Sequence, residues 1–138
     1  MSMDPMRFAL HLKLRKLDDT GILAVILLHE LLLKQGQKNL ELVQGYLSVM
    51  GETCWHVWIV QNEKTVIDLG RIIATLKDPA FENCKFTYSR EKPEGNVTTD
   101  EQNLNIWESR NDKLFWKNAP KKFLEFRSKC HSRVHVRE

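Results

Sequence analysis

Apolar positions divide the chain into one buried helix and a series of shorter segments. From residue 21 to residue 35 the sequence is apolar nearly all round, as in a helix without a solvent face. Gly36 follows at once and suits a left-handed helix end. Residues 18–20, Asp-Asp-Thr, are of the types that cap a helix amino terminus. We therefore predict a buried central helix over residues 21–35.

Strand-like patterns follow this helix. Residues 40–49 and 53–60 are rich in apolar, aromatic and β-branched side chains, and Gly51 between them predicts a tight turn. The polar residues 61–64 predict a second turn, and a third strand is predicted after it over residues 65–70. A fourth strand is predicted over residues 81–89. Together these segments predict a short antiparallel meander.

The outer segments read mainly as helices. Residues 7–17 fit both strand and helix periodicity, and we favour a helix. Residues 90–103 contain Pro, Gly and many polar side chains, which predicts an exposed loop. Residues 104–118 predict a helix, and Pro120 is expected to open another. The expected packing side chains of these last two helices are Leu104, Trp107, Leu114, Phe123, Leu124 and Phe126.

These elements predict an α+β fold in which a buried central helix packs on a small antiparallel sheet, with helices at the carboxyl end. The length of 138 residues is that of one domain. We expect residues 1–138 to form a single domain with its core in about 18–90. A basic helical region over about 104–133 completes it.

Composition narrows the function classes. Hydrophobic residues make up 42% and charged residues 28%, which is typical of a soluble globular protein. No apolar run reaches the length of a membrane span, so we expect no membrane partner. Three cysteines without CxxC spacing predict neither a disulfide framework nor a zinc site, and we expect no metal or cofactor. The amino terminus lacks a signal-peptide pattern, so an intracellular, cytoplasmic protein is expected.

A histidine and an aspartate are the main candidates for chemistry. Side chains two residues apart on a strand share a face, so His56 shares its face with Cys54 and Trp58. Asp68 lies on the next predicted strand, where its carboxylate can accept the imidazole Nδ1–H and leave Nε2 free as a base. A nucleophile for such a pair usually stands at a helix amino terminus, which here would be the start of the helix over residues 21–35.

Four segments in this order carry a family resemblance: "LLHELLLKQG", "LVQGYL", "HVW" and "VIDLG". Their order resembles the transglutaminase-like branch of the papain-like cysteine peptidase superfamily, over roughly residues 18–70. The resemblance implies the same helix-on-sheet fold and an acyl-transfer or amide- or ester-hydrolysing ancestry. It also implies that His56 is the general base and that Asp68 orients it.

The family's nucleophilic cysteine has no counterpart here, since the helix start reads "DDTGILAV". The position falls near Thr20 or Gly21, and an internal threonine lacks the free α-amine that usually activates this residue. Cys54 is the other candidate nucleophile. Residues i and i+2 of a strand stand about 6–7 Å apart, so Cys54 would need a bridging water to reach His56. We favour the simpler explanation of Cys54 as a small buried side chain.

A ligand-binding role stays open beside catalysis. Gln44 and Tyr46 on the neighbouring strand, with Trp58, are candidates to line a cleft around His56 and to hold a peptide or protein ligand. Trp58 is equally explained as a core aromatic. In this interpretation the protein is a degenerate family member, a pseudoenzyme.

The carboxyl-terminal region suggests a third role. Glu125 is the only acid between Lys113 and Arg137, and basic residues alternate there with aromatics. Basic charge with aromatics suits nucleic-acid binding, whereas an amphipathic helix with solvated lysines and buried aromatics gives the same pattern. An acidic protein partner would use the same face. The candidate nucleic-acid-binding residues are Lys113, Lys117, Lys121, Lys122 and Arg127.

Two further histidine-containing stretches have simpler explanations. His29 is expected to be a core or boundary histidine with one hydrogen bond. The run at residues 130–135, "CHSRVH", is expected to be a frayed polar tail. Three interpretations of function therefore stand: a degenerate binding domain, an active enzyme with a non-standard nucleophile, and a nucleic-acid-binding protein. The missing cysteine favours the first.

Overall fold

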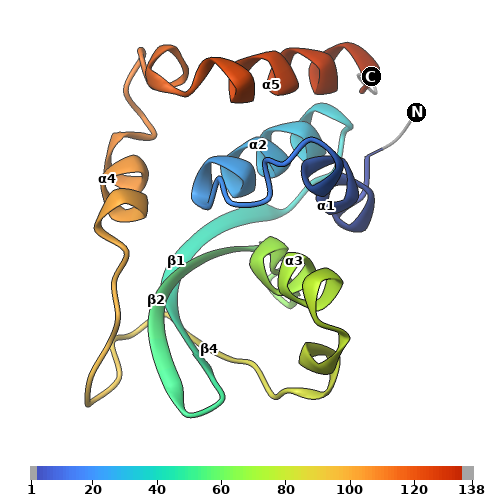
Figure 1. Cartoon of the computed structure of the whole chain (residues 1–138). Coiled ribbons are helices and arrows are strands. Elements are labelled where there is room, and N and C mark those ends of the chain that lie inside the picture. Colours follow the sequence, from blue (N-terminus) through green and yellow to red (C-terminus); the bar gives the residue numbers. More distant parts are fainter. Residues whose placement is uncertain (1–2, 135–138) are drawn as a thin grey trace.

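The computed structural model describes residues 3–134 and is an α+β arrangement of helices around a four-stranded antiparallel sheet of order β3-β2-β1-β4 (Figure 1). The predicted α+β class, with a helix against a small antiparallel sheet, is confirmed at this level. The helices are α1 (Pro5–Leu14), α2 (Ile22–Lys34), α3 (Leu69–Lys77), α4 (Glu101–Ser109) and α5 (Lys121–Arg133). The strands are β1 (Leu40–Val49), β2 (Glu52–Gln61), β3 (Thr65–Ile67) and β4 (Thr87–Ser89), and two short 3-10 helices are η1 (Pro79–Asn83) and η2 (Trp116–Asn118).

Helix α2 is the centre of the core, as its largely apolar sequence predicted. Most of its residues from Ile22 to Leu32 are buried, and Gly36 ends the turn after it with φ +88°. The predicted cap is wrong, because Thr20 Oγ1 donates to the carbonyl of Leu17 at 2.7 Å instead. Gly21, with φ +61°, is the N-cap residue, and the helix begins at Ile22.

The β1–β2 hairpin also matches its prediction. The two strands pair without interruption from Leu40 opposite Gln61 to Val49 opposite Glu52. Met50 and Gly51 form the turn, with φ of +54° and +78°. Two successive positive φ values match the right-handed twist of the flanking strands, which explains the glycine at this point.

The third and fourth strands are shorter than predicted. β3 ends at Ile67, and Asp68 caps the unpredicted helix α3 by accepting the Arg71 N–H. The strand predicted over residues 81–89 survives only as β4, because η1 occupies its first half. The second half of the strand predicted over residues 65–70 is therefore replaced by Asp68, as a helix cap, and by the start of the amphipathic helix α3.

The carboxyl-terminal helices differ in detail from their prediction. The helix predicted over residues 104–118 ends at Ser109, so Leu114 is 52% exposed and Phe115 packs in its place with 7% exposure. Helix α5 begins after Pro120 as predicted. The prediction of a frayed tail over residues 130–135 is wrong for the part that the structure describes. Residues 130–133 continue α5, and Cys130 is buried.

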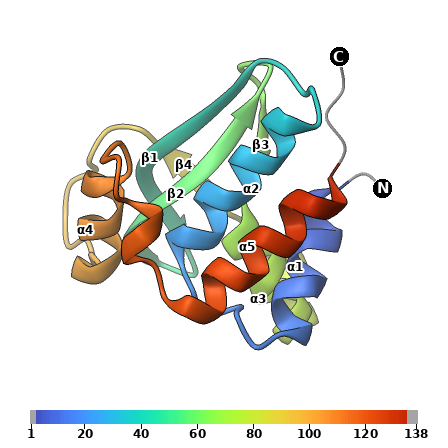
Figure 2. The ribbon, with the colours of Figure 1, turned by 90° about the horizontal axis from the view of Figure 1, so that it is seen from above.

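The elements form layers. Helix α5 lies over α2 on the side away from the sheet, and α1 lies beside α2 (Figures 1 and 2). The main core joins α1, α2, α4 and α5 to one face of the sheet. A second, small cluster of Val43, Trp58 and Val60 with Tyr88 lies on the other face. Within residues 3–134, no helix has the length and apolar character needed to cross a membrane.

Candidate functional site

The predicted pairing of His56 with Asp68 is present. β2 carries His56, and its Nε2 lies 2.8 Å from Asp68 Oδ1 at the end of β3. The Tyr88 hydroxyl donates to the second carboxylate oxygen of Asp68 at 2.7 Å. Burial raises the pKa of Asp68, but hydrogen bonds from His56, Tyr88 and the Arg71 backbone outweigh it and hold the pKa below its usual value. The buried carboxylate is therefore ionised at neutral pH.

The imidazole is oriented the other way round from the prediction. Nε2, rather than Nδ1, bonds to Asp68. Since Asp68 is ionised, Nε2 donates to it, and in the neutral form of the imidazole Nδ1 carries the lone pair. Among the residues that the structure describes, Nδ1 has no hydrogen-bond partner. The atom able to accept a proton from a ligand is thus Nδ1.

Aromatic stacking and a close-packed glycine fix the imidazole. Trp58 stacks on His56 with ring centroids 6.2 Å apart, and Tyr88 packs on Trp58 at 5.1 Å. A Cβ on Gly45 would lie 2.5 Å from the Trp58 ring and 2.4 Å from the Ser89 carbonyl. The glycine of "LVQGYL" is therefore required by the tryptophan of "HVW", and this contact explains why the two motifs occur together.

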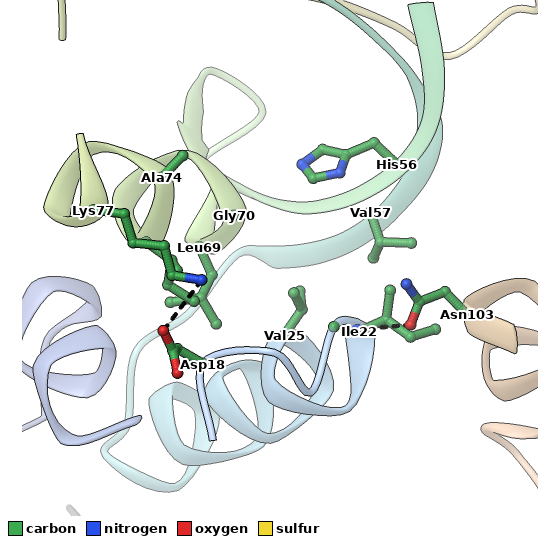
Figure 3. Close-up of a pocket in the computed structure, with 12 residues that line it drawn as sticks. Asp18, Ile22, Val25, His56, Val57, Leu69, Gly70, Ala74, Lys77 and Asn103 are labelled. Atoms are coloured by element: carbon green, nitrogen blue, oxygen red, sulfur yellow. Dashed lines mark hydrogen bonds and ion pairs between the residues drawn. The ribbon is translucent and has the colours of Figure 1, made fainter. Parts of the chain in front are cut away.

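A pocket of about 330 Å³ opens beside His56 (Figure 3). The imidazole extends from β2 towards α3, and the amino terminus of α2 faces it across the space. Asn103 of α4 accepts the Ile22 N–H at 3.3 Å, and Lys77 pairs with Asp18 at 3.2 Å along the wall. The lining residues are Asp18, Gly21, Ile22, Val25, His56, Val57, Leu69, Gly70, Ile73, Ala74, Lys77 and Asn103.

Neither candidate nucleophile lines this pocket. Thr20 lies outside the lining, with its hydroxyl donated to Leu17. Cys54 also lies outside, and burial together with the charges of Asp68 and Glu52 raises its pKa above the usual thiol value. A raised pKa leaves less thiolate, which is the reactive form. Among the residues that the structure describes, no Cys, Ser, Thr or Tyr side chain lines the pocket.

The predicted cleft residues on the neighbouring strand point elsewhere. Gln44 pairs with Val57 and Tyr46 with Trp55, so both share the face opposite to His56. Gln44 Oε1 accepts the Trp55 indole N–H at 3.2 Å. Trp58 is on the His56 face but is 2% exposed and supports the imidazole from behind.

Sequence reasoning missed two contributors to the site. Tyr88 holds the far side of Asp68, and Asn103 closes the pocket at the start of α2. Asn103 is itself held by Asp100, which accepts from both its backbone N–H and its side-chain amide. The only local signal was Asp100 three residues before Asn103, an N-cap spacing that marks the start of α4. Nothing local connects Asn103 to Ile22 across 81 residues.

The aromatic part of the predicted nucleic-acid surface faces inwards. Phe115, Phe123 and Phe126 are buried, and Trp116 is half-buried. Arg127 donates to Glu30 at 2.9 Å and lies 4.4 Å from the Trp116 ring. The candidates Lys113, Lys117, Lys121 and Lys122 are exposed. The lysines of this region are therefore presented without base-stacking rings.

His29 is half-buried beside the backbone of Leu40, and among residues 3–134 its enclosed Nε2 has no hydrogen-bond partner. Burial lowers its pKa, so the ring is neutral. Within residues 3–134 no three His, Cys, Asp or Glu side chains gather as a metal-binding group.

Comparisons with known proteins return no relative. No family model matches the chain, and neither the curated proteins nor the solved structures contain a match. The fold class and the geometry around His56 therefore carry the functional argument by themselves.

Proposed function

We propose that this protein is a degenerate transglutaminase-like domain that binds a small acyl or peptide ligand in the His56 pocket. One observation carries the proposal: the α2 amino terminus and His56 meet across a pocket of about 330 Å³, and Gly21 and Ile22 stand where a nucleophile would be needed. Covalent acyl transfer requires a nucleophile within hydrogen-bonding reach of its base. The lining supplies binding groups without one.

The lining favours a ligand with an aliphatic body and an anionic or amide head. Ile22, Val25 and Val57 form an apolar wall, on which a short hydrocarbon chain can pack. The α2 amino terminus carries partial positive charge, and Lys77 stands at the rim. His56 Nδ1 can accept a hydrogen bond from an amide N–H or a protonated carboxyl group. A short fatty acid or an aliphatic peptide terminus combines these features.

The test is titration of the ¹⁵N-labelled protein with hexanoate and with the N-acetyl amide of leucine. We expect saturable shifts at Gly21, Gly70 and Asn103, and their loss in Ile73→Trp, which fills the pocket from its half-buried wall. Val66→Trp, at an exposed strand position away from the pocket, is the matched control and should bind normally. Absence of saturable shifts in the wild type contradicts the proposal.

A second readout separates binding from catalysis. The protein is incubated with activated esters, and cysteine alkylation is mapped by mass spectrometry across pH 5–9 in wild type and His56→Ala. We expect no His56-dependent ester turnover, and slow alkylation of Cys54 because its pKa is raised. Fast, His56-dependent reaction at Cys54 or Thr20 would establish the active-enzyme interpretation instead.

A further inference from the structure

Helix α1 carries apolar side chains on two opposite sides. Phe8 and Leu12 are fully buried against the core. Met6, Leu10 and Leu14 form a second row at i, i+4 and i+8, with exposures of 48%, 44% and 80%. Single exposed apolar side chains are ordinary, whereas a contiguous row of three marks a contact surface.

The next row of α1 carries two arginines. Arg7, His11 and Arg15 also follow at four-residue spacing, on the side of the helix that faces α5. The Arg15 guanidinium lies 5.9 Å over the ring of Phe126 in α5, which fixes this orientation. Figures 1 and 2 both show α1 beside the carboxyl-terminal half of α5.

Helix α5 presents a matching row. Lys122 and Lys129 line a shallow groove of about 210 Å³ together with Arg15. Arg133 lies further along α5, close enough to His11 that its charge, with those of Arg15 and Arg7, adds to burial in lowering the His11 pKa. Cations from two segments far apart in the sequence therefore share one face.

Little negative charge balances this face. Glu125 is the acid that lines the groove, and in the described part of the chain Arg15, Lys122, Lys129 and Arg133 enter no salt bridge. The opposite side of α5 differs, since Arg127 and His131 there both bind Glu30. Unbalanced charge on one side of the helix points to an anionic partner outside the chain.

We propose that this face binds the surface of an anionic membrane. Met6, Leu10 and Leu14 enter the boundary between headgroups and acyl chains, while the flanking cations of α1 and α5 contact lipid phosphates and carboxylates. We call it the lipid-docking face and define it by these residues: Met6, Leu10, Leu14, Arg15, Lys122, Lys129 and Arg133. Contact of this kind needs no spanning helix, and the expectation of no membrane partner rested on the lack of a span.

The shape and chemistry of the face favour lipid over other anionic partners. Leu14 is 80% exposed on the convex surface of α1. A partner helix binds in a groove, whereas a convex apolar surface can insert into a lipid interface. Nucleic-acid backbones use the cations but leave the apolar row in water. A second copy of the chain would bring like charges together. Of a lipid surface, a nucleic acid and a second copy, the lipid interface is the one that uses both rows.

The test is co-sedimentation of the whole protein with vesicles of phosphatidylcholine alone or with about 30% phosphatidylserine. We expect binding to the anionic vesicles, and a steep fall in binding between about 50 mM and about 500 mM salt. A labelled single-stranded oligonucleotide is titrated in parallel by fluorescence anisotropy. Equal binding to both vesicle types, or to neither, overturns the proposal.

Paired variants separate the two rows. Lys122→Gln with Lys129→Gln should weaken vesicle binding by about 25-fold, at about fivefold for each charge removed. Leu10→Gln with Leu14→Gln should weaken it by about tenfold. The matched controls are Lys64→Gln with Lys85→Gln, which removes the same charge elsewhere, and Met50→Gln with Val66→Gln, which alters exposed apolar positions elsewhere. Both controls should bind like the wild type.

A nucleic-acid surface gives a different pattern: oligonucleotide binding that the charge variant weakens and the apolar variant leaves unchanged. That result overturns the lipid proposal, as does vesicle binding that either control pair reduces as much as its test pair. Circular dichroism checks that each variant is folded. If the leucine pair fails to fold, Leu14→Gln alone, at the 80% exposed position, gives the same comparison.

Discussion

Two histidine–carboxylate pairs occur within residues 3–134, and they differ in what surrounds them. His56 lies 2.8 Å from Asp68, and His131 lies 2.7 Å from Glu30. The histidine side chains are similarly exposed, at 22% and 26%, but Asp68 is 2% exposed and Glu30 31%. His56 borders a pocket, whereas His131 joins Arg127 in fastening α5 to α2.

The comparison shows that a short histidine–carboxylate contact does not by itself identify a functional site. Asp68 has its oxygens occupied by His56, Tyr88 and the Arg71 backbone, which makes it a rigid anchor. Glu30 accepts from two basic side chains and bridges two helices. The distinguishing features are the cavity beside His56 and the deeper burial of its carboxylate partner. Four experiments break or sharpen this contrast, from the largest expected effect to the smallest.

Removing each carboxylate should give the largest difference. Asp68→Ala leaves the Tyr88 hydroxyl and His56 without their buried partner, so we expect the free energy of unfolding to fall by about 3–5 kcal/mol. Glu30→Ala should cost about 1–2 kcal/mol, because its partners are partly solvated. Urea unfolding of both variants measures the difference. Equal losses would show that the two pairs have the same structural weight.

Disturbing the support behind His56 should come next. Gly45→Ala forces a methyl group against Trp58 and the Ser89 carbonyl, and we expect a loss of about 1–3 kcal/mol with a shift of the His56 ring resonances. The His131 resonances should not move. Gly51→Ala is the control, because a Cβ there meets nothing within 4 Å and its cost comes only from its φ of +78°. Unchanged His56 resonances in Gly45→Ala would refute the role given to this glycine.

Introducing a cysteine at the start of α2 tests whether the pocket beside His56 can still activate a thiol. Ile22→Cys places a thiol in the pocket at the first residue of α2, and we expect it to be alkylated about tenfold faster than Cys54 at neutral pH. Ser132→Cys, beside His131 on an exposed helix position, should react at an ordinary rate. Alkylation rates mapped by mass spectrometry give the comparison, and similar rates at positions 22 and 132 would remove the distinction between the two histidines.

Acid should act on both pairs in the same direction. Burial raises the pKa of Glu30, but hydrogen bonds from Arg127 and His131 outweigh it, so its pKa in the folded state lies below the ordinary 4.5. The Asp68 pKa lies below its ordinary 3.8 for the corresponding reason. A depressed folded-state pKa gives stability that is complete above the ordinary value and is lost as the pH falls through the folded value. The urea concentration at the unfolding midpoint should therefore decrease as the pH is lowered below about 4.5. The decrease should be less steep in Glu30→Gln. An unchanged slope in that variant would contradict the assignment.

The sequence predicted those parts of the fold that local patterns determine. The apolar run of α2 and the hairpin around Gly51 carry their own periodicity and turn residues, and the pairing of His56 with Asp68 follows from adjacent strands. Helix α3 was missed because residues 65–70 fit a strand with Asp68 in its interior, whereas Asp68 is the helix cap. The choice of Nε2 over Nδ1 depends on the approach angle of Asp68, which no one-dimensional pattern records.

The position of Asn103 has a consequence for cooperativity. Its side-chain carbonyl accepts a hydrogen bond from the first backbone N–H of α2. The side chain that caps the central helix therefore lies 81 residues away in the sequence. Undocking of α4 would release that amide and remove one wall of the pocket in the same event. We therefore expect protection of the Ile22 amide against hydrogen exchange to report whether α4 is docked against the pocket.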